Sequence, residues 1–386
     1  MPADDQSHPA PRTLFLTGAT GFLGAFILAE LLGRTADTVH CLVRAKDDAH
    51  GIERIRDGLT GFGIWRDEYQ PRIRPVPGDL TRPLLGMSEQ TFSRLASDID
   101  VIYHAGAQVN FVYPYAALKA ANVGGTQEVI RLAVRHHVKP VHYVSAIDAM
   151  VKLGEVRVKE DDPLPLSPIP HGYVQSKWAA ERAVAAAQAK GLQVSIYRPW
   201  LIGAHSQTGV CHTSDYVLRL LHGCLEAGIV PSHEESLNIS TVDFFSSALV
   251  HISLNDENIG KPYHLANPRG EPLPDLYERI RSFGYRLDEL PYEVWRDRLN
   301  RTLPPASAAY SVLPLIPEHP APEGARHPSI DCTRSLAALE GTGITCAPLD
   351  ERLVHLQLGY LVDVGFLPPP EHTGRAELTT TSTARA

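Results

Sequence analysis

Tyr173 and Lys177 are the two residues of this sequence best suited to acid–base chemistry. They lie four residues apart in a run with the pattern of a helix, so their side chains share one face. An ammonium group beside a phenol favours the phenolate and lowers the pKa of the tyrosine from about 10. The tyrosine can then protonate a carbonyl oxygen as hydride reaches the carbonyl carbon. We therefore predict that both residues are catalytic.

A glycine-rich turn near the N-terminus is the second feature that points to chemistry. The stretch Thr17–Gly24 has the spacing Gly-x-x-Gly-x-x-Gly, after the apolar run Leu14–Leu16 and before the amphipathic run Ala25–Leu32. Strand, glycine turn and helix form the context of a dinucleotide site, because glycines let the backbone approach a pyrophosphate and the helix N-terminus attracts its charge. The cofactor-binding residues predicted here are Gly18, Thr20, Gly21, Phe22 and Leu23.

Arg44 indicates which dinucleotide binds, because it ends the second predicted strand 20 residues after Gly24. Dinucleotide folds place here an acid for a free ribose 2′-hydroxyl, or an arginine near a 2′-phosphate. No acid occupies this strand end, so we predict NADPH rather than NADH. Asp79, after the third strand, can accept a hydrogen bond from an adenine amino group. The remaining predicted cofactor contacts are Leu80, Ala105, Gly106, Ala107, Asn122, Tyr173, Lys177 and Pro199.

Strand and helix patterns alternate up to Pro199. This alternation predicts an α/β fold of the Rossmann type, a doubly wound parallel sheet with helices on both faces and ligands at the carboxyl ends of the strands. The predicted strands are 13–17, 38–43, 73–76, 101–104, 141–145 and 194–197. The predicted helices between them are 22–32, 52–59, 88–96, 115–135 and 173–189.

Beyond Pro199 the alternation breaks, which predicts a smaller C-terminal substrate-binding subdomain. Its predicted elements are helices at 216–227, 242–254, 273–283 and 349–361, strands at 238–241 and 263–265, and an irregular proline-rich segment at 303–329. The predicted organisation is a disordered N-terminus (1–12), an NADPH-binding domain (13–200), a substrate- and carrier-binding subdomain (201–370) with some segments returning to the sheet, and a disordered tail (371–386).

The composition is that of an ordinary globular protein, with 44% hydrophobic and 21% charged residues among 386. No apolar run reaches the roughly 20 residues of a membrane span, so no membrane association is expected. A net charge of −8 without a basic block argues against nucleic-acid binding. The five cysteines are scattered and form no metal-type pair, so we expect no metal site and a cytoplasmic location.

Several motifs together resemble the extended short-chain dehydrogenase/reductase family. Within it they look like the thioester reductase domains that end some nonribosomal peptide and polyketide assembly lines and occur in carboxylic acid reductases. The resemblance covers about residues 13 to 370 and is most specific in the first half. The segments that carry it are Tyr103-His104, Val109-Asn110, Pro114-Tyr115, Asn122–Thr126, Val141–Ser145, Gly172–Trp178, Ile196–Pro199 and Gly365–Pro368.

The resemblance implies a reaction. A carrier protein or CoA delivers an acyl thioester, NADPH supplies hydride to its carbonyl carbon, and Tyr173 protonates the oxygen. The hemithioacetal collapses and releases an aldehyde, which some members reduce again to an alcohol. Lys177 would orient the cofactor and tune Tyr173. We expect a stand-alone enzyme whose acyl carrier comes from another chain.

Ala146 departs from this group, which usually carries threonine or serine directly after Ser145. One hydrogen bond to the carbonyl oxygen is then missing, and such a donor is worth about 10² to 10³ in rate. Ser145 could replace it only if the strand end twists, because strand neighbours point to opposite faces. Asp148 and His171 are the nearby polar residues in the sequence. With Tyr173 and Lys177, the positions Ser145 and Ala146 make up the candidate catalytic residues.

Three alternative functions stay open. Non-reductive release by a Dieckmann-type cyclisation would suit the loss of the hydroxyl at Ala146. A nucleotide-sugar epimerase or dehydratase of the same superfamily would usually have an acid where this chain has Arg44. A catalytically silent NADPH-binding scaffold is the third. Tyr173 and Lys177 favour the reductase.

Overall fold

The computed structural model describes residues 10–151, 157–168, 171–232, 236–267, 269–319 and 328–370. The predicted disordered tail and residues 1–9 of the predicted disordered N-terminus lie outside these described residues. Arg12 already belongs to the packed structure, since its backbone N–H donates to Asp37 Oδ1 at 2.7 Å.

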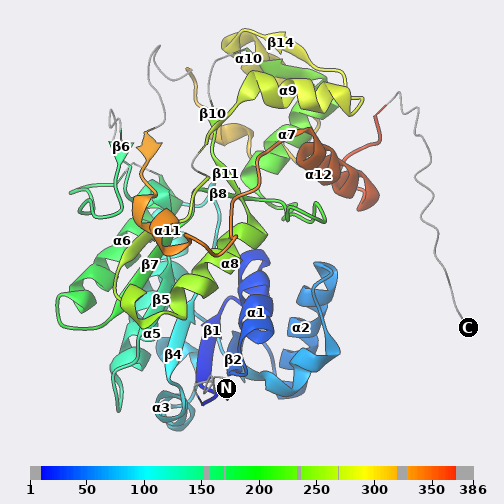
Figure 1. The fold of residues 1–386 in the computed structure, drawn as a ribbon. Helices are drawn as coiled ribbons and strands as arrows, with labels where there is room; N and C mark the ends of the chain where they lie inside the picture. Colours follow the sequence, from blue (N-terminus) through cyan, green and yellow to red (C-terminus); the bar gives the residue numbers. More distant parts are fainter. Residues whose placement is uncertain are drawn as a thin grey trace, which may run out of the picture.

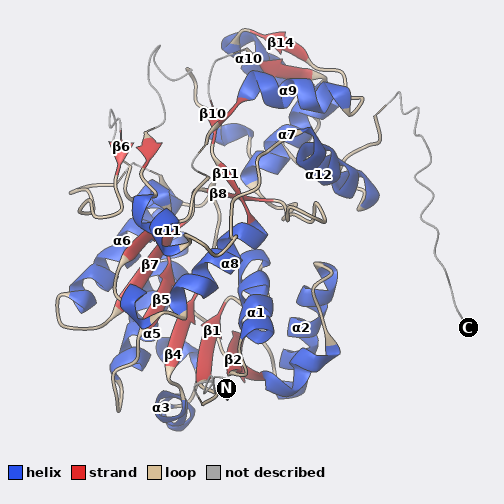
Figure 2. Cartoon of the chain, viewed as in Figure 1, coloured by secondary structure: helices blue, strands red, loops and turns tan. Residues whose placement is uncertain are grey.

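A seven-stranded parallel sheet forms the centre of the molecule, with strand order β12-β7-β5-β4-β1-β2-β3 (Figure 2). The sequence predicted all seven of these strands to within about one residue, the seventh as 263–265 in the C-terminal part. The strands are β1 (Thr13–Thr17), β2 (Thr38–Val43), β3 (Ile73–Pro77), β4 (Val101–His104), β5 (Val141–Val144), β7 (Val194–Arg198) and β12 (Pro262–His264). The order reverses between β1 and β4, and such a switch point creates a crevice for ligands at the carboxyl ends of the strands.

Helices cover both faces of the sheet (Figure 1). The two faces of β1 show why: Leu14 and Leu16 enter the hydrophobic core with one set of helices, while Phe15 enters the core with the other set. The first set is α1 (Phe22–Arg34), α2 (Asp48–Gly61) and α8 (Val242–Ser253); the second is α3 (Glu89–Asp98), α5 (Gly125–Val134) and α6 (Gly172–Gln188). The predicted doubly wound α/β class is therefore confirmed.

The C-terminal part contributes to the sheet and also builds a core of its own. β12 pairs with β7, and α8 packs against α1, so two segments from beyond residue 200 return to the dinucleotide-type layer. The separate core lies among four helices, α7 (Tyr216–Ala227), α9 (Leu273–Ser282), α10 (Tyr292–Thr302) and α12 (Glu351–Asp363). The sequence did not predict α10, whose composition is strongly polar; only Trp295 and Leu299, one turn apart, are buried in it.

Short elements complete the described residues. Four two-stranded pairs are β8 (Leu201–Gly203) with β11 (Ile239–Thr241), β9 (Ile229–Pro231) with β14 (Asp288–Leu290), β10 (Ser236–Leu237) with β13 (Glu271–Pro272), and β6 (Arg157–Val158) with β15 (Ser329–Ile330). Two short helices are α4 (Tyr115–Lys119) and α11 (Thr333–Ala338), and 3₁₀ turns span Asp67–Arg72, Pro83–Gly86, Ile147–Ala149, Asp256–Asn258 and Leu313–Leu315. None of the helices in the described part is long and apolar enough to cross a membrane.

Candidate active site

The glycine turn after β1 touches the loop after β4 with no space between the backbones. Gly18 has φ +86°, a conformation that favours glycine, and a Cβ placed on it would lie 2.8 Å from the backbone N of Gly106. A Cβ on Gly24 would overlap the carbonyl of Gly18. Helix α1 then begins at Phe22 with Gly21 as its N-cap, a residue without a capping side chain. This cradle fits the diphosphate of a dinucleotide, which helix N-termini bind through their backbone N–H groups.

A buried polar chain holds the two loops together. Thr17 Oγ1 accepts a hydrogen bond from Gly106 N at 2.9 Å and lies 2.7 Å from His104 Nδ1. The other ring nitrogen of His104 lies 3.0 Å from Thr126 Oγ1 on α5. Burial, with the charge of Lys177, lowers the pKa of His104 to about 3, so its ring is neutral. The sequence analysis did not predict a role for Thr17 and Thr126. The pattern that could have indicated them is a hydroxyl side chain in an otherwise apolar strand or helix face.

The other predicted cofactor residues of this half gather around the cradle. Leu80 packs over the loop after β4, since a Cβ on Gly106 would lie 2.8 Å from Leu80 Cδ1. Ala105 and Ala107 flank Gly106 and are half-buried. Of the other residues in the glycine turn, Thr20 and Leu23 are half-buried, whereas Phe22 turns its ring toward Phe26 and Phe62, with centroids 5.3 Å apart in both cases.

Arg44 and Asp79 follow the ends of β2 and β3, which are neighbours in the sheet. Burial raises the pKa of Asp79, but hydrogen bonds from Thr81 and the charges of Arg44 and Arg82 outweigh it and lower that pKa overall. Asp79 Oδ1 accepts from Thr81 N and Thr81 Oγ1, each at 2.8 Å. The two predicted recognition residues therefore follow neighbouring strands, and the charge of Arg44 acts on Asp79.

Tyr173 and Lys177 lie on the face of α6 that packs against the sheet, and they are only 8% and 4% exposed. Lys177 Nζ donates to the carbonyl of Val144 at 2.7 Å and lies 4.7 Å from the ring centroid of Tyr143. Burial lowers the pKa of Lys177 to about 8, and the charge of Glu181 opposes the decrease.

The pKa of Tyr173 differs from the sequence expectation. Burial raises this pKa well above its ordinary value, and the negative charge of Asp148 raises it further. Lys177 does not lower this pKa in the structure, and its ammonium group donates to the Val144 carbonyl at the end of β5. Tyr173 is therefore a protonated phenol in this structure, which is the form that can give a proton to an oxygen.

Ser145 and Ala146 follow β5 directly and have different surroundings. Ser145 Oγ donates to the carboxylate of Glu181, so its hydroxyl is already engaged inside the protein. Ala146 is 5% exposed and brings no polar side chain. The residue after Ala146 is fixed by its backbone, since Ile147 N donates to the carbonyl of Pro199, beyond the end of β7, at 2.8 Å. The position after Ser145 is thus held firmly but offers no hydroxyl.

Glu181 and Arg198 form a buried ion pair beneath these residues. Arg198 Nη2 and Nε lie 2.5 and 3.0 Å from Glu181 Oε1, and the side chains of Arg198 and Glu181 are 4% and 1% exposed. Arg198 Nη1 also donates to the Glu160 carbonyl and lies 3.1 Å from His264 Nε2. Sequence reasoning missed the role of both residues; the signal for Glu181 is its four-residue step from Lys177.

Asn122 links the loop after β4 to α6. Its side-chain amide accepts from Gln108 N at 2.7 Å and donates to Gln108 O and to Ser176 Oγ at 3.0 and 2.9 Å. Ser176 Oγ in turn donates to the Tyr173 carbonyl at 2.7 Å. The helix predicted over 115–135 is interrupted here by a π-helical turn, Ala120–Gly124, a form often found at functional sites.

Aromatic rings that the sequence reasoning missed surround Tyr173. Phe111, in the loop after β4, has its ring centroid 5.1 Å from Tyr173, 5.5 Å from His171 and 5.9 Å from Tyr216. Tyr216 begins α7, so this aromatic cluster (Phe111, His171, Tyr173, Tyr216) joins the sheet layer to the C-terminal part. Phe111 has no sequence pattern of its own; only its apolar side chain, close to other apolar residues of the loop, could have indicated that it packs near the site.

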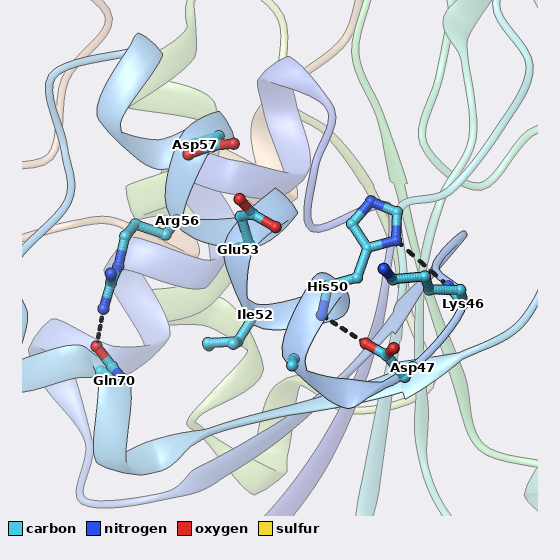
Figure 3. Close-up of a pocket in the computed structure, with 9 residues that line it drawn as sticks. Lys46, Asp47, His50, Ile52, Glu53, Arg56, Asp57 and Gln70 are labelled. Atoms are coloured by element: carbon cyan, nitrogen blue, oxygen red, sulfur yellow. Dashed lines mark hydrogen bonds between the residues drawn. The ribbon is translucent and has the colours of Figure 1, made fainter.

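A surface pocket of about 530 Å³ lies apart from these residues, on the outer side of α2 (Figure 3). Within it, His50 N donates to Asp47 Oδ1 at 2.8 Å and Lys46 N to His50 Nδ1 at 3.3 Å. Acidic and basic side chains alternate around it, so it does not select one sign of charge. Its lining residues are Lys46, Asp47, Ala49, His50, Ile52, Glu53, Arg56, Asp57 and Gln70. Within the described residues no group of three or more His, Cys, Asp or Glu could hold a metal ion.

Comparisons with known sequences show the family of the chain. The family model described as male sterility protein, an NAD-binding family, matches residues 16–249. A linear gramicidin synthase polypeptide of Brevibacillus parabrevis is 38% identical over 371 residues, which is 94% of this chain and 7% of that protein. Aldehyde reductase lnbA of Aspergillus flavus is 35% identical over 86% of this chain and 36% of that protein. The chain therefore spans a small part of these relatives.

Solved structures extend the comparison. The terminal R domain from the myxalamid PKS-NRPS biosynthetic pathway superposes with a TM-score of 0.89 and 44% identity, covering 94% of this chain and 93% of that one. The reductase domain of a nonribosomal peptide synthetase from Mycobacterium tuberculosis reaches 0.78 and 26%, covering 94% and 95%. A UDP-glucuronic acid 4-epimerase from Bacillus cereus, 15% identical with a TM-score of 0.63 and 91% and 99% coverage, shares the fold alone. From its glycine cradle, its Tyr173–Lys177 pair and these matches, the chain belongs to the male sterility protein family of nicotinamide-dependent reductases, in the thioester reductase group of the extended short-chain dehydrogenases/reductases.

Proposed function

We propose that this chain reduces an acyl thioester, held by a carrier protein or CoA, and releases the acyl group as an aldehyde in natural-product biosynthesis. The single observation that carries the proposal is the buried Tyr173–Lys177 pair at the carboxyl end of β5. A protonated phenol beside a crevice for a dinucleotide is what carbonyl reduction requires.

The side chains of this protein would supply the proton and would hold the reacting groups in place. A nicotinamide cofactor would supply hydride for the thioester carbonyl carbon, and Tyr173 would give its proton to the oxygen. The resulting hemithioacetal loses its C–S bond: the hydroxyl proton moves to the sulfur, and aldehyde and thiol leave. Lys177, whose ammonium group lies at the end of β5, would hold the nicotinamide ribose. A second round on the aldehyde would give the alcohol.

NADPH is the cofactor that we propose. Gly18, Thr20, Gly21, Phe22 and Leu23 would hold the diphosphate. Arg44 would contact the 2′-phosphate and Asp79 the adenine; their places after neighbouring strands support this assignment. The remaining contacts would come from residues after β3, β4 and β7, from the turn Ala120–Gly124 and from α6, namely Leu80, Ala105, Gly106, Ala107, Asn122, Tyr173, Lys177 and Pro199.

The two-part organisation is also a proposal. Residues 13–200 would bind the cofactor, and residues 201–370 would bind the acyl chain and its carrier, with β12 and α8 serving the sheet layer. The separate core of α7, α9, α10 and α12 supports this division. We further propose a cytoplasmic location, which the five free cysteines support.

The test is oxidation of NADPH with a simple acyl-pantetheine, an acyl-CoA and an acyl-loaded carrier protein, with NADH in parallel. Trapping of the product separates aldehyde from alcohol. We expect NADPH oxidation that the Tyr173→Phe variant loses by about 10² or more. Tight NADPH binding without oxidation on any of the three substrates would contradict the proposal.

A second candidate is non-reductive release by cyclisation, which Ala146 favours together with the engagement of Ser145 by Glu181. The same assay decides between the two when it also includes a thioester whose acyl chain carries a carbon nucleophile able to attack its own carbonyl, because a simple acyl thioester cannot cyclise. Release of a cyclised product without loss of NADPH absorbance would establish the second candidate in place of reduction.

A further inference from the structure

Each further hydrogen-bond donor at the carbonyl oxygen speeds the reduction of a thioester, because negative charge develops on that oxygen in the transition state. Tyr173 is one donor. Ala146 has none, and the hydroxyl of Ser145 already donates to Glu181. Asp148 is close enough to raise the pKa of Tyr173, and as a carboxylate it accepts hydrogen bonds without donating any. A second donor must come from another residue.

His171 is the candidate that the contacts around Tyr173 suggest. It is the N-cap of α6, two residues before Tyr173, and its ring lies 5.5 Å from Phe111, whose other contacts include Tyr173 itself. Its Nδ1 is buried and has no hydrogen-bond partner in the described structure. A buried ring nitrogen without a partner costs free energy, so such an atom calls for an explanation.

The backbone around His171 is packed tightly. Gly172, between His171 and Tyr173, has no space for a side chain, because a Cβ there would overlap the carbonyl of Tyr113 and lie 2.8 Å from Tyr115 N. The loop that carries Phe111 therefore presses on the start of α6, with His171 on one side of the contact and Tyr173 on the other. The same loop exposes the apolar side chains of Val109 and Val112, as the entrance for an acyl chain would.

We propose that His171 is a catalytic residue of this chain, whose Nδ1–H donates a hydrogen bond to the thioester carbonyl oxygen and takes the place of the hydroxyl absent at Ala146. The proposal rests on the proposed thioester reductase function. Neutral imidazole has one N–H, and the Nδ1–H form is a donor. Because the bond strengthens as charge develops on the oxygen, its loss lowers kcat and kcat/KM by the same factor.

The experiment replaces His171 in the full chain and in an Ala146→Thr background. We expect His171→Phe to lower kcat by about 10², with cofactor affinity unchanged. Asparagine places an amide nitrogen at the position of Nδ1, whereas glutamine places it near Nε2; His171→Asn should keep most of the activity and His171→Gln should lose it. In the Ala146→Thr background the added hydroxyl supplies the second donor, so His171→Phe should cost less than about tenfold.

His137→Phe is the control, since His137 lies between α5 and the start of β5, where its Nε2 is 3.1 Å from the Ile99 carbonyl, just before β4. It should leave kcat unchanged. The proposal would be overturned if His171→Asn and His171→Gln had equal activity. It would also be overturned if His171→Phe lost the same factor in both backgrounds. If the Phe variant does not fold, the comparison of the Asn and Gln variants decides. Inactivity of the unchanged chain on all three thioesters would instead remove the proposed function itself.

Discussion

The Ser145 hydroxyl donates a hydrogen bond to the Glu181 carboxylate, and both side chains are buried between β5 and α6. Glu181 stands four residues after Lys177 and eight after Tyr173, so one face of α6 carries all three. Because the carboxylate also takes two contacts from Arg198, a negative charge is held in place below the reactive pair. This charge raises the pKa of Lys177, against the effect of burial.

The first prediction concerns pH. Burial lowers the pKa of Lys177 to about 8 in spite of the opposing charge of Glu181. The ammonium form exists below this pKa and is lost above it, so kcat/KM should fall as pH rises through about 8. In Glu181→Gln the opposing charge is gone, and the decline should move to lower pH. The measurement is kcat/KM for NADPH oxidation against pH, which reports the groups of the free enzyme.

Glu68→Gln is the control for this pH profile, because Glu68 lies on the surface with 70% of its side chain exposed. Its profile should coincide with that of the unchanged chain. A decline that stays in place or moves to higher pH in Glu181→Gln would show that Glu181 does not set the charge of Lys177.

The second prediction concerns stability. Arg198→Met leaves the buried Glu181 carboxylate without its cation, and breaking a buried pair in this way costs about 3–5 kcal/mol. Arg301→Met removes an exposed pair with Asp297, whose side chains are 77% and 56% exposed, and should change stability by less than about 0.5 kcal/mol. Urea unfolding midpoints check both. If the two variants lost similar amounts of stability, the buried ion pair would contribute no more to stability than the exposed one.

The third prediction tests the glycine cradle. A Cβ at Gly24 would overlap the Gly18 carbonyl, so Gly24→Ala must push α1 away from the turn, at a cost of about 1–3 kcal/mol. NADPH affinity should fall about tenfold or more, measured by the quenching or enhancement of NADPH fluorescence. Gly61→Ala at the end of α2 is the control, since a Cβ there meets nothing within 4 Å. If Gly24→Ala binds NADPH as tightly as the unchanged chain, the glycine turn does not hold the cofactor.

The fourth prediction tests the choice of cofactor. Arg44→Ala removes the charge proposed to meet the 2′-phosphate, and a hydrogen bond to a charged group is worth about 1.5–3 kcal/mol, or about tenfold or more in kcat/KM for NADPH. Because NADH has no 2′-phosphate, kcat/KM for NADH should change by less than about threefold. Arg56→Ala is the control, because Arg56 lies on α2 and stacks on Trp65. An equal loss with both cofactors would assign Arg44 a structural role.

Much of the sheet layer could be predicted from the sequence because its signals are local. Apolar runs such as Leu14–Leu16 sit next to glycine turns, and Tyr173 and Lys177 have helical spacing. The strand ends agree with prediction to about one residue for this reason. Where the local pattern is weak, prediction failed: α10 is polar along most of its length and is a helix because Trp295 and Leu299 pack into the C-terminal core.

The sequence alone determined which residue types stand at the ends of the strands and on α6, since a period of two or of 3.6 residues is visible within a few positions. Only the tertiary structure decided what those residues touch. The bond from Ser145 to Glu181 spans 36 positions, and the contact of Phe111 with Tyr173 joins the loop after β4 to the start of α6. The direction of the Lys177 ammonium, the pKa of Tyr173 and the unpartnered Nδ1 of His171 all follow from such long-range packing, because burial and charge depend on neighbours in space rather than in sequence.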